Sequence, residues 1–281
     1  MNIEKITIIH GHGKSMQNDK IESISLEMGN VVSIVGPTGS GKTTLINDIA
    51  LFANKNTPSN RTILINDELP PDEIIHDPSK NPIAFITQHT NFLSDLPVNK
   101  FLEIHARIRK SGSSESIIEE TLDFANQLTG EPIILESSMT ELSGGQTRSL
   151  LIADAVVIGN SPIILLDEIE NAGIHRTKAL ELLRNYKKIF IFVTHDPRIT
   201  LLSDFRIIME NGRINDLLFT NDEERRAVGH IKKLDDLLLE LRTLIRMGKN
   251  IKEDFILENL YSYSDTDKNS TLDELTGEVL V

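Results

Sequence analysis

The sequence contains no cysteine and no tryptophan, and it has no long hydrophobic run. Without cysteine the chain can form neither a disulfide, a thiolate zinc site nor an iron–sulfur cluster. The longest apolar runs, at 163–166 and 189–193, have the length of a strand, whereas a membrane-spanning helix needs about 20 apolar residues. The N-terminal residues lack the basic start and long apolar stretch of a secretory signal. We therefore expect a cytoplasmic protein with no direct insertion into a membrane.

Positive charge is also scarce, and the formal net charge is −13. Nucleic acids and anionic membrane surfaces both favour clustered Lys and Arg, so this balance argues against a direct contact with either. Any role at a membrane would then depend on a partner protein that holds the chain at its inner face. The content of 39% hydrophobic and 25% charged residues is that of an ordinary globular protein with one or two domains.

Strands and helices are expected to alternate over the first two thirds of the chain, the pattern of a parallel α/β sheet. Short β-branched or apolar runs predict strands, and a helix is expected from Lys42 to about Phe52. Spacings of three and four predict helices within 91–139. The Pro-rich segment 70–82 is expected to be an irregular surface loop. The predicted strands are 1–9, 31–35, 62–66, 83–87, 163–166, 189–193 and 206–209, and a hairpin turn is expected at 210–213.

A different pattern begins near residue 221. Apolar residues recur in steps of three and four, which predicts one helix with a narrow apolar stripe. The stripe is typical of a helix that packs on its own protein. A helical dimer seam is the alternative, but it normally needs three or four heptads, and Gly248 ends the pattern early. The acidic tail beyond residue 258 is expected to be loosely structured. The stripe consists of Ile231, Leu234, Leu238, Leu241 and Ile245.

A glycine-rich segment lies between the strand predicted at 31–35 and the helix that follows it. It fits G-x-x-x-x-G-K-[ST], in which backbone N–H groups and a helix N-terminus surround a triphosphate. Glycine leaves out the Cβ atoms that would keep phosphates away from the backbone. Lys42 is placed to contact the β- and γ-phosphates of ATP, and the Thr43 hydroxyl to join a Mg²⁺ shell. The predicted nucleotide-binding residues are Gly36, Pro37, Thr38, Gly39, Ser40, Gly41, Lys42, Thr43 and Thr44.

Two consecutive carboxylates, Asp167 and Glu168, end the strand predicted at 163–166. Phosphate-loop proteins hold Mg²⁺ with an acidic residue on a neighbouring strand, so Asp167 is predicted as a metal ligand through water. A second carboxylate directly after it is placed to polarise an attacking water molecule. By itself, an acidic pair after an apolar strand is also typical of a solvated turn.

The segment Leu142-Ser143-Gly144-Gly145-Gln146 matches the signature of ATP-binding-cassette (ABC) ATPases, which residues 1–218 resemble. Gln88 matches the family's glutamine between the Mg²⁺ site and the helical subdomain, and His195 matches its switch histidine. The resemblance implies an α/β fold, a P-loop NTPase core of the ABC type with an antiparallel β subdomain. It implies a helical subdomain inserted at about 89–158 of an ATPase domain at 1–220. Residues 221–281 are then a C-terminal helical extension with an acidic tail.

The resemblance also implies a division of roles. In the family two cassettes pack head to tail, so that the signature of one chain, here Ser143, Gly144, Gly145 and Gln146, meets the ATP of the other. The single phosphate loop and signature of this chain then imply a homodimer or a dimer with a paralogous subunit. ATP closes the dimer and hydrolysis opens it. The implied catalytic residues are Glu168, His195 and Gln88, and the implied Mg²⁺ ligands are Thr43, Gln88 and Asp167.

Two segments depart from the family's pattern. After the acidic pair most members have Pro-Thr-Ser-Ala-Leu-Asp, where this chain has 169–174, ending in Ile174 instead of the aspartate that helps to couple the two sites. Members usually also stack an N-terminal aromatic residue on adenine. Here His10 and His12 stand in a glycine-rich stretch instead, so either a histidine stacks on the base or the stretch is a flexible hairpin.

Three functions are compatible with these motifs. The first is the ATP-hydrolysing subunit of a transporter whose transmembrane permease is another chain, contacted through the helical region at about 90–108. The second is a soluble ABC-type ATPase that remodels or activates a partner macromolecule. The third, a nucleotide-binding module without turnover, is disfavoured by the presence of Glu168 and His195. The transporter subunit is the favoured prediction, because most members of the family serve transport.

Overall fold

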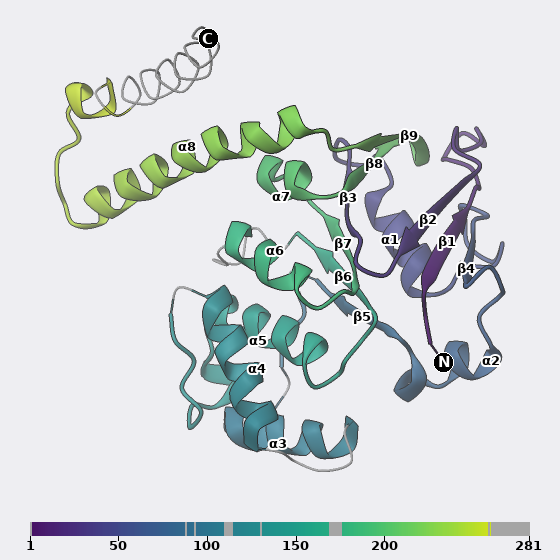
Figure 1. Cartoon of the computed structure of the whole chain (residues 1–281), viewed down its shortest axis with the longest axis horizontal. Coiled ribbons are helices and arrows are strands. Elements are labelled where there is room, and N and C mark those ends of the chain that lie inside the picture. The colour runs from purple at the N-terminus through teal and green to yellow at the C-terminus, as the bar shows by residue number, and fades with distance from the viewer. Residues whose placement is uncertain are drawn as a thin grey trace, which may run out of the picture. The chain divides into compact units, whose positions relative to one another are not determined.

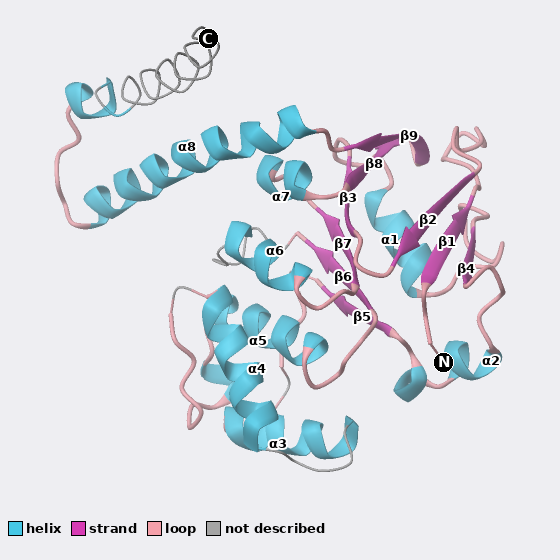
Figure 2. Ribbon diagram, in the orientation of Figure 1, coloured by secondary structure: helices cyan, strands magenta, loops and turns pink. Residues whose placement is uncertain are grey.

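The computed structural model describes residues 2–87, 89–92, 94–109, 115–129, 131–168, 176–257 and 259. The chain divides into two units, Met1–Thr220 and Asn221–Val281, and strands alternate with helices in the first (Figures 1 and 2). The strands are β1 (Lys5–Ile9), β2 (Ser23–Glu27), β3 (Val31–Val35), β4 (Thr62–Ile65), β5 (Ile83–Ile86), β6 (Ile163–Asp167), β7 (Ile189–Val193), β8 (Phe205–Glu210) and β9 (Arg213–Phe219). The helices are α1 (Lys42–Ala50), α2 (Asp72–His76), α3 (Val98–Arg109), α4 (Glu115–Leu128), α5 (Gly144–Val156), α6 (Arg176–Arg184), α7 (Pro197–Leu202) and α8 (Asp222–Arg246), with 3₁₀ turns at Pro78–Lys80 and Met139–Glu141.

The strands of the first unit form two sheets. A six-stranded sheet has the order β5-β6-β7-β3-β8-β9, in which β9 alone is antiparallel to its neighbour. A three-stranded antiparallel sheet has the order β2-β1-β4. The predicted α/β fold with an antiparallel β subdomain is therefore confirmed. The sequence prediction missed β2, a strand of five residues in which Ile24 and Leu26 alternate with exposed residues.

The parallel sheet is covered on both faces, which is why its strands are apolar almost throughout. On one face Leu166 of β6 and Phe192 of β7 pack with the core of the helical part, α3 to α5. On the other face Leu165 and Ile191, one residue earlier on each strand, pack with α1 and the antiparallel sheet. Successive side chains of a strand point to opposite faces, so two strands serve two separate hydrophobic cores.

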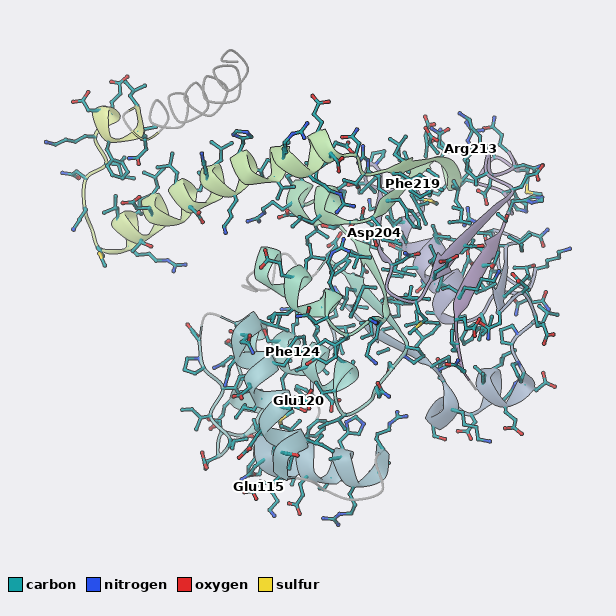
Figure 3. The ribbon with its side chains drawn as sticks, viewed as in Figure 1. Glu115, Glu120, Phe124, Asp204, Arg213 and Phe219 are labelled. Atoms are coloured by element: carbon teal, nitrogen blue, oxygen red, sulfur yellow. The ribbon has the colours of Figure 1, made fainter. Side chains whose placement is uncertain are left out.

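The inserted helical part consists of α3, α4 and α5. The spacing of Phe101, Ile104 and Ile108 predicts that these three residues share the apolar face of this helix. The buried side of α3 is instead formed by Val98, Leu102 and Ala106, whereas Ile104 and Ile108 are 42% and 74% exposed. Phe124, labelled on α4 in Figure 3, stacks edge to face on Tyr186 after α6, with ring centroids 5.2 Å apart. The apolar period therefore locates the helix correctly but does not identify its buried side.

The expectation of an irregular loop at 70–82 is wrong. The segment contains the short helix α2 and the 3₁₀ turn Pro78–Lys80. Asp72 and Glu73 lie in the first turn of α2, where carboxylates favour the positive end of a helix. At the end of the segment Lys80 forms a salt bridge with Glu73 at 2.7 Å. Proline in this segment starts short helices instead of preventing them.

The described part of the second unit includes the long helix α8 over Asp222–Arg246. Asn221 and Glu224 form a reciprocal capping box at its start, which satisfies N–H groups that the helix itself leaves unpaired. Leu234, Leu238 and Ile245 of the apolar stripe are exposed. The tail beyond residue 259 lies outside the described residues. Within the described ranges no helix has the length and apolar character to cross a membrane.

Candidate functional site

Three of the predicted functional segments lie where neighbouring parallel strands end. Val193, the last residue of β7, is paired with Ile34 of β3 on one side and with Asp167 of β6 on the other. The phosphate loop after β3, the acidic pair after β6 and His195 after β7 therefore leave the same edge of the sheet. Adjacent strands lie about 4.8 Å apart, so the three segments share one site although they are distant in sequence.

The phosphate loop has a backbone shape that depends on glycine. Gly36, Gly39 and Gly41 have φ angles of 150°, 79° and 99°, a region that other residues adopt only with strain. Helix α1 follows directly, and its N-cap position is Gly41, which offers no side-chain cap. The first N–H groups of the helix are thus not occupied by a capping side chain and can bind an anion.

Lys42 is the one charged residue among the predicted nucleotide-binding residues 36–44, and its side chain turns back into the loop. It is only 7% exposed, and its ammonium donates to the carbonyl oxygens of Gly36 at 2.8 Å and Pro37 at 3.1 Å. These carbonyl bonds hold the ammonium inside the arch of the loop. Phosphate oxygens of a bound nucleotide compete for the same donors, and charge-assisted bonds to them are stronger than bonds to neutral carbonyls.

The phosphate loop is supported from outside by two segments that the sequence prediction did not connect with it. Gly212, in the turn between β8 and β9, donates its N–H to the Ser40 carbonyl at 2.8 Å. Lys14 donates its ammonium to the Gly39 carbonyl at 3.1 Å and its backbone N–H to the Asn211 carbonyl at 3.1 Å. The turn at 210–213 was predicted as a hairpin, but no local pattern indicates that it touches the loop.

This contact gives a testable difference between two glycines. A Cβ at Gly41 would lie 2.7 Å from the Gly212 Cα, whereas a Cβ at Gly39 would meet no atom within 4 Å. Both positions have a positive φ, so both substitutions to Ala carry backbone strain, but only Gly41→Ala adds a backbone collision. We expect Gly41→Ala to lower the free energy of unfolding by about 2 to 4 kcal/mol and Gly39→Ala by about 1 kcal/mol. Urea unfolding without nucleotide measures both, and equal losses would contradict the contact.

The acidic pair ends β6 with a change of backbone direction. Glu168 adopts a left-handed φ of 50°, and its N–H donates to the Val193 carbonyl at 3.0 Å. This bond ties Glu168 to the end of β7, two residues before the exposed His195. Asp167 precedes the turn and is half-buried at the strand end. Asp167 thus ends the strand and Glu168 lies in the turn after it, so the two carboxylates have different backbone settings, which suits two different roles.

The signature segment begins helix α5 in the helical part. Ser143 is its N-cap, and its hydroxyl accepts the Gln146 N–H at 3.3 Å while the Gln146 side chain accepts the Ser143 N–H at 2.9 Å. Gln146 also donates to the Pro132 carbonyl at 3.0 Å. Ser143 and Gly144 are exposed, so a helix N-terminus suited to an anion faces outward. Figure 1 shows α5 beside α4 in the helical part, separate from α1 and the phosphate loop.

Some predicted residues lie outside the described residues, and the two N-terminal histidines contact backbone carbonyl groups. Gln88 and the segment 169–174, which contains Ile174, are not described. His10 is exposed and its ring contacts the Glu22 carbonyl at 3.2 Å, while the His12 ring contacts the carbonyl of Gly13 at 3.2 Å. No group of three or more His, Asp or Glu side chains that could bind a metal occurs among the residues with described positions.

Comparison with known proteins decides the family. The sequence profile of the ABC transporter family matches residues 20–171. The ABC transporter ATP-binding protein MJ0121 of Methanocaldococcus jannaschii is 45% identical over 256 residues, which cover 91% of this chain and 98% of that protein. The chain belongs to the ABC transporter family. As an ABC ATPase it binds ATP and hydrolyses it, as its motifs predict.

Two further matches place the ABC ATPase among its relatives. The macrolide export ATP-binding/permease protein MacB of Campylobacter jejuni is 31% identical over 206 residues. The match covers 68% of this chain and 30% of that protein. The solved dimeric, post-hydrolysis ATP-binding cassette MJ0796, bound to ADP and Pi, covers 77% of this chain with a TM-score of 0.58 and 23% identity. The second likeness shows that the fold is that of an ABC cassette.

Proposed function

We propose that the protein is the ATP-driven subunit of a transporter and works as a head-to-tail dimer. The observation that carries this proposal is the separation of its two phosphate-binding parts. The phosphate loop follows β3, whereas the exposed signature begins α5 in the helical part. Each chain has one of each, so two chains facing each other form two complete sites. ATP bound between them holds the dimer together, and its hydrolysis releases the two cassettes.

Within each site the residues have separate tasks in this proposal. The loop N–H groups and Lys42 bind the phosphates, and Ser143 with the N–H groups of Gly144 and Gly145 of the second chain binds the γ-phosphate. Glu168 accepts a proton from the attacking water, and His195 holds the γ-phosphate and orients Glu168.

The oxygen donors of this edge fit Mg²⁺ as the nucleotide's counter-ion. Thr43, in the first turn of α1, offers a hydroxyl, and Asp167 offers a carboxylate at the end of β6. Hydroxyl and carboxylate oxygens are hard ligands that Mg²⁺ prefers. The family resemblance adds Gln88, which lies outside the described residues, as a third ligand. When bound, the ion neutralises charge on the phosphates.

A mixing experiment tests the shared site. Lys42→Ala removes the phosphate-loop cation of one chain, and Ser143→Arg blocks the signature of another. Each variant alone is expected to lack ATPase activity, because both sites of its homodimer are incomplete. A mixture forms one intact site in each mixed dimer, so about one quarter of the unmodified activity should return at equal concentrations. If the mixture stays as inactive as its components, the site is not shared between chains.

A transmembrane partner is the second part of the proposal. Ile104 and Ile108 are exposed on α3, within the helical region at about 90–108 that the resemblance assigns to the permease contact. The name of the Campylobacter relative joins ATP-binding and permease parts in one protein, whereas this chain matches 30% of its length. Purification of the tagged chain from native cells in detergent is expected to recover an integral membrane protein. Recovery of a purely soluble complex would instead support the ATPase that remodels a macromolecule.

Substitution of the two exposed isoleucines tests this contact, and substitution of two leucines elsewhere is the matched control. Ile104→Ser with Ile108→Ser is expected to release the membrane protein during purification while ATP-dependent dimerisation is retained. The double substitution Leu51→Ser with Leu69→Ser, at two exposed apolar positions outside α3, is expected to leave the membrane partner bound.

A further inference from the structure

One arginine side chain is completely enclosed by the first unit. Arg61, directly before β4, is 0% exposed, and it forms salt bridges with Asp19 at 2.8 Å and with Asp48 at 3.1 Å. Both carboxylates are also shielded from water, with side chains 0% and 2% exposed. Burial of charges is costly unless every one is paired and hydrogen-bonded. We call Asp19, Arg61 and Asp48 the buried triad.

The geometry of the buried triad is fully specified by hydrogen bonds. Asp19 receives a two-pronged contact from Arg61, at 2.9 Å from Nε and 2.8 Å from Nη2, and also the N–H groups of Gly11 at 2.9 Å and Ile214 at 2.6 Å. Burial alone would raise the pKa of Asp19, but the hydrogen bonds and charge of Arg61 outweigh it and hold that pKa below its ordinary value. Asp19 is therefore ionised at neutral pH and fixes the plane of the guanidinium.

The Nη2 group of the same guanidinium also donates to the turn that supports the phosphate loop. Arg61 Nη2 donates to the Gly212 carbonyl at 3.0 Å, and the Gly212 N–H donates to the Ser40 carbonyl at 2.8 Å. The Gly212 Cα also lies so close to Gly41 that no Cβ fits there. Gly212 is thus held between the guanidinium and the loop; Arg213, the next residue, is labelled at this hairpin turn in Figure 3.

The other arm of the buried triad reaches the helix that follows the loop. Asp48 lies in α1, the helix that begins with Lys42. It accepts the Arg61 Nη1 donor at 3.1 Å and the Ser59 hydroxyl at 2.7 Å. One guanidinium therefore connects the turn that contacts the loop and the helix that continues it.

We infer that the buried triad is a positioning element that keeps the phosphate loop in its nucleotide-binding shape, and that Arg61 raises the affinity for ATP without touching it. The loop cannot supply this rigidity itself, because its three glycines permit many backbone conformations. Several N–H groups must point at the phosphates together, so a shift of the loop weakens several hydrogen bonds at once. A site held in place before binding loses less free energy to ordering when the nucleotide arrives.

Arg61→Lys tests this role. Lysine keeps the positive charge, but a single ammonium cannot reproduce the planar fork that contacts both carboxylates and Gly212. We expect KM for MgATP and the dissociation constant for MgADP to rise about tenfold, with kcat changed by less than about twofold. These contacts hold the phosphates alike in ground and transition states, so they affect binding more than turnover. A purely structural role would act differently, because loss of folded protein lowers the apparent kcat and leaves KM unchanged.

Two companion variants complete the experiment. Asp48→Asn leaves the fork between Arg61 and Asp19 in place, so it should fold and raise KM about threefold. Arg184→Lys alters another arginine–aspartate pair, in which Arg184 lies 2.9 Å from Asp204 and also donates to the Leu202 carbonyl, away from the buried triad. The KM of this variant should stay unchanged. The inference is overturned if KM for both triad variants stays within about twofold of the unmodified protein. Should Arg61→Lys not fold, the KM of Asp48→Asn decides alone.

Discussion

Glu168→Gln is expected to lower kcat for ATP hydrolysis by about 100-fold or more while ATP binding is retained. The glutamine has the same size, and the N–H of residue 168 still reaches the Val193 carbonyl, which lies 3.0 Å away in the unmodified chain. What is lost is the carboxylate that accepts a proton from water, and general bases of this kind contribute about 10² to 10⁴ in rate. Steady-state phosphate release measures the loss.

The same variant should form a dimer that closes on ATP and does not reopen, because hydrolysis is blocked. Size-exclusion chromatography with MgATP is expected to show a stable dimer for Glu168→Gln and a shorter-lived one for the unmodified chain. Glu27→Gln, at the exposed end of β2, makes the same change of charge away from the site and should keep full turnover. A Glu168→Gln chain that remains monomeric in ATP would contradict the ATP-closed dimer. Hydrolysis at the unmodified rate would show that another group is the base.

Lys42→Ala is expected to weaken ATP binding by about 30- to 150-fold. The ammonium contributes charge-assisted hydrogen bonds to the phosphates, and loss of such bonds costs about 2 to 3 kcal/mol. It also removes the two bonds at 2.8 and 3.1 Å to the loop's own carbonyl groups, so the empty loop loses an internal support. Isothermal titration with MgATP gives the dissociation constant.

A second lysine variant separates charge from position. Lys80→Ala removes a lysine whose side chain is 52% exposed and paired with Glu73, outside the nucleotide site. Its ATP affinity should remain within about twofold of the unmodified value, since exposed pairs of this kind contribute little to stability. Tight ATP binding by Lys42→Ala would contradict the assignment of the phosphate loop.

Much of the fold could be predicted from sequence because its signals are local. An apolar run bounded by glycine or a carboxylate identifies β3 and β6, and a glycine-rich loop followed by Lys42 identifies the nucleotide-binding turn. The order of the motifs then identified the family. Prediction failed where the signal depends on surroundings, as on α3, where the buried side chains Val98 and Leu102 share the helix with exposed isoleucines.

The supports of the phosphate loop could not be predicted in this way. Arg61 appears in the sequence as an ordinary polar residue before a strand, and its partners stand 42 and 13 positions away. Gly212 was expected in a hairpin turn, but only the folded sheet brings that turn against Ser40. Pairings over such separations follow from topology, because β8 lies beside β3 in the sheet although paired residues such as Val32 and Phe205 are far apart in the sequence.

The start of the signature helix has a consequence for how two chains communicate. In the single chain the Ser143 hydroxyl accepts the Gln146 N–H at a rather long 3.3 Å, so the helix completes its own end. In the dimer that we propose, a phosphate belonging to the opposite chain's nucleotide takes over as the terminal acceptor for that helix. The nucleotide then contacts the N-terminus of one helix in each subunit, α1 of the chain that binds it and α5 of the opposite chain. After its last phosphate is cleaved, the Ser143 hydroxyl again caps α5. Each hydrolysis event therefore changes the hydrogen bonding at the first turn of α5 in the partner cassette, and the other end of that helix is packed in the partner's own core.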